Sequence, residues 1–217
     1  MNFIIIFDLS YKYIRLPTYK VILNKKQSKI IIWKITESEG ELISILSNEA
    51  SLKKLEKLKA PSHRKQYLTS QILLKQNNLL AKVFKDENGK PLISDSSAHI
   101  SISHDTDYVA LMIANTPCGI DLQHLTKKVL RIKNKFYDSI TDITDGDELI
   151  HFFTKVWSIK EAIYKVNGDP QVFFKEHIRI TSMTDKQAEI DVLHPKYQNK
   201  FEVNIHKLDK IYLVYTT

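Results

Sequence analysis

The sequence is poor in cysteine, and Cys118 is the single one among its 217 residues. One thiol can form neither a disulfide framework nor a metal site built from several cysteines. Long apolar runs are also missing, because no stretch approaches the roughly 18–20 residues that a membrane helix needs. Heptads, low-complexity tracts and short tandem repeats are absent as well. These absences predict a soluble protein in a reducing, cytoplasmic compartment, with no membrane contact.

The composition is that of an ordinary globular protein, with 43% hydrophobic and 26% charged residues. A chain of this length can bury one large core or two smaller ones of about 100 residues each. The stretch Asn115-Thr-Pro-Cys-Gly119 is the best candidate boundary. We therefore expect half-domains over residues 1–115 and 116–217.

Positive charge is concentrated in the first half. Residues 1–115 carry 17 Lys and Arg against 11 Asp and Glu, a net charge of +6, and residues 116–217 carry 15 against 14, a net charge of +1. A basic half favours an anionic partner, which can be a nucleic acid, a phosphorylated small molecule or an acidic protein. A merely soluble surface explains the charge equally well.

Apolar patterning predicts strands and helices in the first half. We expect strands over residues 1–8, 19–23 and 29–36 and helices over 39–48 and 49–59. Ser62 is the expected N-cap of a longer helix that ends near residue 80. The first turn of that helix is basic and includes Arg64. Cations are unfavourable beside the positive end of the helix dipole, and either a bound phosphate or plain solvation would offset this repulsion.

A turn and a hairpin follow this helix. Asn88-Gly89 supplies the positive-φ positions of a turn, and Lys90 is expected at its tip. Residues 98–104 alternate, with isoleucines on one face and Ser101 and Ser103 on the other. The apolar run 108–114 completes a hairpin with this strand, which ends at His104.

The second half begins with a short strand, Gly119-Ile-Asp-Leu-Gln123, in which Asp121 and Gln123 point to the same face. A short helix is expected over 127–137, and a long one that begins at Asp145 or Asp147 and ends at Asn167-Gly168. Strands should follow over 177–182, 188–193, 201–206 and 211–215. The class is α+β, with two similar half-domains that pair helices with antiparallel sheets and are related by a pseudo-two-fold.

The long helix carries the most informative residues. Glu161 and Lys165 lie four residues apart on one face, with Ser158 one turn earlier on the same side. An ordinary surface ion pair and an acid–base pair at a reacting centre are both compatible with this spacing. Trp157 is expected in the core, and Lys160 is expected to be solvated.

Four motifs in order give the chain a family resemblance. They are Gly89-Lys-Pro91, Ile102-Ser-His104, Gly119-Ile-Asp-Leu-Gln123 and Trp157-Ser-Ile-Lys-Glu-Ala-Ile-Tyr-Lys165. The chain thereby resembles the 4′-phosphopantetheinyl transferase superfamily, in its longer, monomeric type that acts on carrier domains of synthetases. The resemblance covers residues 60–168 most closely.

The resemblance implies an activity and a metal. Members move the phosphopantetheine arm of coenzyme A to a serine of an apo carrier protein and release adenosine 3′,5′-bisphosphate. The matching positions imply that Mg²⁺ is held by Asp121, Gln123 and Glu161, and that Glu161 and Lys165 are catalytic. Magnesium prefers such oxygen ligands. Which of Glu161 and Lys165 removes the serine proton stays open.

The same resemblance implies the partners. The residues expected to contact the phosphates of coenzyme A are Arg64, Lys90, Ser103 and His104. An acidic acyl or peptidyl carrier protein is the expected macromolecular partner, whereas no nucleic-acid-reading motif is found. Gln123 departs from the family pattern, which usually has Glu, so a catalytically weakened homologue that binds coenzyme A or a carrier is the alternative.

Overall fold

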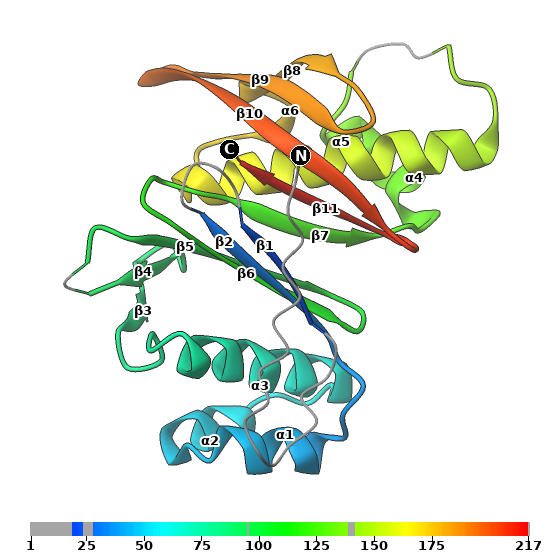
Figure 1. Cartoon of the computed structure of the whole chain (residues 1–217). Helices are drawn as coiled ribbons and strands as arrows, with labels where there is room; N and C mark the ends of the chain where they lie inside the picture. Colours follow the sequence, from blue (N-terminus) through cyan, green and yellow to red (C-terminus); the bar gives the residue numbers. More distant parts are fainter. Residues whose placement is uncertain (1–18, 24–27, 95, 139–141, 217) are drawn as a thin grey trace. The chain divides into compact units, whose positions relative to one another are not determined.

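The computed structural model describes residues 19–23, 28–94, 96–138 and 142–216 (Figure 1). The strand expected over residues 1–8 lies outside the described residues. Two compact units are found among the described residues: the first runs up to Phe84 and from Pro91 to Thr116, and the second holds Lys85–Lys90 and the described residues from Pro117 onward. The boundary was expected after residue 115, and the division lies one residue later, after Thr116. Lys85–Lys90 was expected in the first half, but it groups with the second unit.

The first unit packs its longest helix against an antiparallel sheet with the strand order β1-β2-β6-β5, and its two shorter helices pack on that helix. Its sheet strands are β1 (Tyr19–Leu23), β2 (Lys29–Lys34), β5 (His99–Asp105) and β6 (Tyr108–Ala114). Its helices are α1 (Glu39–Leu46), α2 (Glu49–Leu55) and α3 (Pro61–Gln76), and the short strands β3 (Val83–Lys85) and β4 (Pro91–Ile93) pair separately. The hairpin predicted from the alternating residues is confirmed, because Asp105 pairs with Tyr108 at its closed end.

The start of α3 differs from the prediction. Ala60 is the N-cap and Pro61 occupies the first helical position, so the predicted N-cap at Ser62 is wrong. Proline suits that position because its φ is already helical and its missing N–H would have had no partner within the helix. The helix also ends earlier than expected, at Gln76.

The second unit packs the long helix α5 (Gly146–Asn167) along one face of a five-stranded antiparallel sheet (Figure 1). The strand order is β7-β11-β10-β9-β8. The strands are β7 (Ile120–His124), β8 (Ile178–Met183), β9 (Gln187–His194), β10 (Tyr197–Leu208) and β11 (Ile211–Thr216). The remaining helices are α4 (Lys128–Ile132), the 3-10 turn Lys133–Lys135 and α6 (Phe174–His177). The helix expected over 127–137 is thus shorter and partly 3-10.

Both units confirm the α+β class. The similarity of the two halves stays a prediction, because the described elements come in a different order along the chain. In the first unit the helices follow two strands of the sheet, whereas in the second unit they follow one. Within the described ranges, no helix is long and apolar enough to cross a membrane.

Candidate active site

Helix α5 is held at both ends by its caps. Asp145 accepts hydrogen bonds from the backbone N–H groups of Asp147 and Glu148, at 2.9 and 2.8 Å. At the other end Gly168 takes a positive φ of 65°, which glycine adopts without strain. The predicted start and end are both confirmed. The apolar face of the helix, with Ile159 and Ile163, packs on the sheet.

Asp121 lies on β7 and is only 4% exposed. Its Oδ2 accepts a hydrogen bond of 2.8 Å from Ser158 Oγ, and its Oδ1 accepts one of 2.8 Å from Lys165 Nζ. Lys165 Nζ also donates to the carbonyl of Ile120 at 3.0 Å. The partner of Lys165 is therefore an aspartate on the neighbouring strand, which brings strand and helix residues into one polar cluster.

Gly119 explains how β7 comes so close to α5. A Cβ built at this position would lie 1.9 Å from the carbonyl oxygen of Ala162, far inside contact distance. Only glycine lets the two backbones approach this closely. Asp121 is two residues further along the strand, so this contact keeps the part of β7 that carries Asp121 close to α5.

Glu161 is the electrostatically perturbed group of the cluster. Its pKa is raised from 4.5 to about 7, first by burial and second by the negative charge of Asp121, while Lys165 opposes the shift. Two carboxylates and one lysine leave a net negative charge in a mostly buried place. A carboxyl whose pKa lies near neutrality is suited to proton transfer, and a pair of close carboxylates is suited to a cation.

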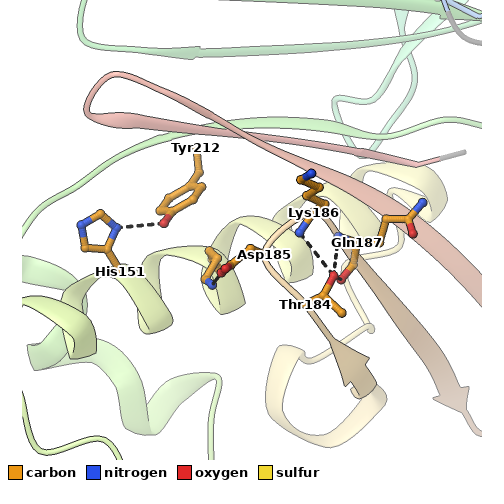
Figure 2. A network of polar contacts seen from close by, with 7 residues as sticks. His151, Thr184, Asp185, Lys186, Gln187 and Tyr212 are labelled. Atoms are coloured by element: carbon orange, nitrogen blue, oxygen red, sulfur yellow. Dashed lines mark hydrogen bonds and ion pairs between the residues drawn. The ribbon is translucent and has the colours of Figure 1, made fainter. Parts of the chain in front are cut away.

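Gln123 follows Asp121 on the same face of β7. Its cross-strand neighbour is Tyr212, and its amide nitrogen lies 3.5 Å from the carbonyl of His124. Figure 2 shows the His151 ring directed at the Tyr212 hydroxyl, and their atoms lie 2.8 Å apart. His151 belongs to none of the four motifs, although it precedes Ser158 by seven residues, or two helical turns, on the same face.

Lys160 contradicts the expectation of a solvated lysine. It is buried, and its Nζ donates to the carbonyls of Phe174 and Ile178, each at 2.6 Å. These carbonyls belong to the first residue of α6 and to the residue after its end, so Lys160 joins this short helix to α5. Burial lowers the pKa of Lys160 to about 8. Trp157 and Tyr164, three residues before and four residues after Lys160 on the helix, both contact the Phe174 ring. These two aromatic neighbours are the feature of the sequence that could have indicated a buried lysine.

Arg64 makes structural contacts within the first unit. Its Nε and Nη2 donate to the Glu39 carboxylate at 2.9 and 2.6 Å, and its Nη1 donates to the carbonyls of Leu55 and Leu58 at 2.8 and 3.1 Å. The guanidinium thus ties α3 to α1 and to the end of α2. This arrangement supports a structural role, and its contact with a phosphate stays a prediction.

Ser103 and His104 lie on opposite faces of β5, the edge strand of the first sheet, with Ser103 buried and His104 exposed. Lys90 follows the predicted turn, in which Gly89 has a φ of 84°. It is not an open loop tip, because Lys90 Nζ donates to the carbonyl of Val166 at the end of α5. The structure brings Asp121, Ser158, Glu161 and Lys165 together within the second unit, and the phosphate contacts stay predictions.

The donor set of the cluster fits a hard divalent cation. Magnesium takes oxygen ligands and is commonly held by one or two carboxylates, with substrate phosphates and water completing its shell. Asp121 and Glu161 supply two carboxylates, and Gln123 follows on the same strand face with a neutral amide oxygen. Among the described residues, no three His, Cys, Asp or Glu side chains form a metal-binding group. A third protein ligand here would therefore have to be of another type, such as the amide.

Comparisons with known proteins agree with this cluster. The family described as the 4′-phosphopantetheinyl transferase superfamily matches residues 117–216, which include β7 and α5. The 4′-phosphopantetheinyl transferase gsp of Aneurinibacillus migulanus is 28% identical over 48% of this chain and 44% of its own length. The transferase psf-1 of Bacillus pumilus is 27% identical over 60% and 58%, respectively. The transferase Sfp of Bacillus subtilis (strain 168) is 30% identical over 54% and 56%. The matched part of this chain spans about half the length of these curated relatives.

Proposed function

We propose, from the match of residues 117–216 to the 4′-phosphopantetheinyl transferase superfamily and from the relatives that carry that name, that the chain transfers the 4′-phosphopantetheine arm of coenzyme A to a serine of an apo carrier protein. The observation that carries the proposal is the joint placement of Asp121 on β7 and of Glu161 and Lys165 on α5. In this reaction the serine oxygen attacks the phosphorus that bears the pantetheine arm. The bond from that phosphorus to the bridging oxygen of the pyrophosphate breaks, and adenosine 3′,5′-bisphosphate leaves with the bonding electrons.

Asp121 and Glu161 would hold Mg²⁺, with the Gln123 amide oxygen as a supporting ligand. A bound magnesium ion supplies charge neutralisation for the pyrophosphate and the leaving group. Glutamine brings no negative charge, so the two carboxylates have to provide the electrostatic attraction. The Asp121 carboxylate is already oriented by its hydrogen bonds to Ser158 and Lys165.

Glu161 and Lys165 have distinct tasks in the proposed reaction. Glu161, directly or through a water, would accept the serine proton, and its pKa of about 7 in the metal-free chain suits that task. Lys165 is an ammonium group beside the carboxylates and offsets charge on the phosphoryl oxygens. The dependence of the transfer rate on pH tests which group is the base. If the midpoint of its low-pH limb stays in place as the magnesium concentration rises, Glu161 is supported as the base. If that midpoint moves to lower pH, Glu161 is assigned to the metal.

The first unit would contact the phosphates of coenzyme A through Ser103 and His104, and its net positive charge favours an acidic carrier protein. Arg64 and Lys90 would contribute only by exchanging contacts that they already make. The chain is expected to be a monomer, and size-exclusion chromatography with light scattering tests that expectation. The cytoplasmic location stays a prediction.

Intact-mass measurement tests the activity. An apo carrier protein incubated with coenzyme A, Mg²⁺ and the chain should gain the mass of one phosphopantetheine arm. The gain should disappear with Asp121→Ala and with Glu161→Ala, whereas Glu87→Ala, at an exposed turn residue, should leave it intact. No gain on acyl, polyketide and peptidyl carriers would refute the proposal. Retained coenzyme A binding without transfer would then favour the weakened homologue that Gln123 suggests.

A further inference from the structure

Ser158 uses its hydroxyl differently from two other buried helical hydroxyl residues, Thr154 and Ser70. Thr154 on the same helix donates to the carbonyl of Ile150 at 2.6 Å, and Ser70 in α3 donates to the carbonyl of Gln66 at 2.8 Å. Both are bonds to the residue four positions earlier, which is the usual local choice for a helical hydroxyl. Ser158 instead donates to Asp121 Oδ2, 2.8 Å away on another element.

The bond between Ser158 and Asp121 is fully buried. Ser158 has no exposed surface and Asp121 is 4% exposed. A hydroxyl has one proton to donate, so this bond commits the donor capacity of Ser158 to the carboxylate. A hydrogen bond to an ionised group in a poorly solvated place is stronger than a neutral one in water. The bond therefore acts on the orientation of Asp121 and not on the helix backbone.

We propose that Ser158 is a positioning residue that fixes the Asp121 carboxylate for the divalent cation, an inference that rests on the proposed function. Lys165 alone would hold this carboxylate loosely, because its donor sits at the end of a long side chain. Ser158 has a single side-chain torsion before its oxygen and lies on a packed helix, so its oxygen is fixed in space. One donor on each oxygen sets the plane of the carboxylate.

The two bonds act on both oxygens of the Asp121 carboxylate. Oδ2 accepts a hydrogen bond from Ser158 Oγ and Oδ1 accepts one from Lys165 Nζ. Glu161 follows Ser158 by three residues on the same helix face. A partner that orients a metal-binding carboxylate typically contributes 10–100-fold to metal affinity. We expect the same range for Ser158.

The test is the dissociation constant for Mn²⁺, measured on the full chain without coenzyme A by electron paramagnetic resonance, with Mg²⁺ as the competitor. Ser158→Ala should raise the dissociation constant about 10–100-fold. Ser158→Cys keeps a similar volume with a poor donor and should also bind weakly, whereas Ser158→Thr restores the hydroxyl and should recover binding. Thr154→Val is the matched control, because it removes a buried hydroxyl that does not contact Asp121.

Several outcomes would overturn the inference. They are an unchanged dissociation constant in Ser158→Ala, an equal loss in Thr154→Val, or a wild-type chain that binds no Mn²⁺. Circular dichroism of each variant identifies loss of fold, and Ser158→Cys provides the comparison if Ser158→Ala does not fold. The proposed function fails separately: a wild-type chain that binds Mn²⁺ but adds no mass to carriers refutes the transferase and leaves the role of Ser158 intact.

Discussion

Replacing Glu161 by glutamine should make the protein more stable at neutral and alkaline pH. The carboxyl group of Glu161 is largely buried beside Asp121, and its pKa is raised from 4.5 to about 7. The folded state therefore disfavours the ionised form, which predominates above pH 7. A glutamine of nearly the same shape never ionises, so the variant avoids this cost.

The size of the effect follows from the shift in pKa. A raised pKa means that the folded state binds the proton more tightly than the unfolded chain, so the contribution of the neutral carboxyl is fully present below about pH 4.5 and is lost as the pH rises through about 7. The rise of the pKa from 4.5 to about 7 corresponds to about 3 kcal/mol. The stability advantage of Glu161→Gln should be near zero at pH 4.5 and should approach this value above pH 7.

Urea unfolding followed by circular dichroism, at several pH values between 4.5 and 8.5 and with a chelator present, measures this advantage. Glu87→Gln removes one negative charge from an exposed turn and serves as the control. An advantage of the same size at pH 4.5 and pH 8 would refute the electrostatic reasoning, since it would then stem from packing. A less stable variant at pH 8 would refute it as well. The same variant should lose transferase activity.

Two further predictions concern the packing around the site. Gly119→Ala should both destabilise the protein and weaken its Mn²⁺ binding. The added Cβ would lie 1.9 Å from the Ala162 carbonyl oxygen and push β7 away from α5. Gly40→Ala is the control and should have neither effect, because the added Cβ meets nothing within 4 Å. Lys160 has a pKa lowered to about 8, so the folded state releases its proton before the unfolded chain does and stability should rise with pH from about 8 toward 10.5. Comparison of urea midpoints between wild type and Lys160→Met across that range should show the rise in the wild type alone.

Local patterns predicted the elements of the site well. The capping residues and apolar spacing of α5 predicted its start at Asp145 or Asp147 and its end at Asn167-Gly168, and the structure has Asp145 and Gly168 as the caps. The alternation in β7 predicted Asp121 and Gln123 on one face. These features depend on interactions within a few residues, which a sequence displays directly. The motif order then indicated that this strand and this helix work together.

Contacts between distant segments were not predictable in this way. The partner of Arg64 is Glu39, 25 residues earlier, and Lys160 reaches carbonyls 14 and 18 residues later. Nothing in the first turn of α3 distinguishes a cation that binds a phosphate from one that joins three helices. The i,i+4 spacing of Glu161 and Lys165 was similarly ambiguous, since the lysine pairs across to Asp121.

The electrostatics of the cluster connect its stability to its chemistry. The ion pair between Asp121 and Lys165 balances one negative charge, so Glu161 carries the charge that remains uncompensated, and its ionisation costs stability. A core chosen for stability alone would place a neutral side chain there. Glu161 is also the residue best suited to accept a proton or bind a cation near neutral pH. The close approach at Gly119 and the bond from Ser158 each hold Asp121 near Glu161 and so maintain the perturbation. A function that uses the Glu161 carboxylate explains why the protein keeps an ionisable group there at the expense of stability. It also explains why β7, the capped helix α5 and Gly119 hold that carboxylate beside Asp121.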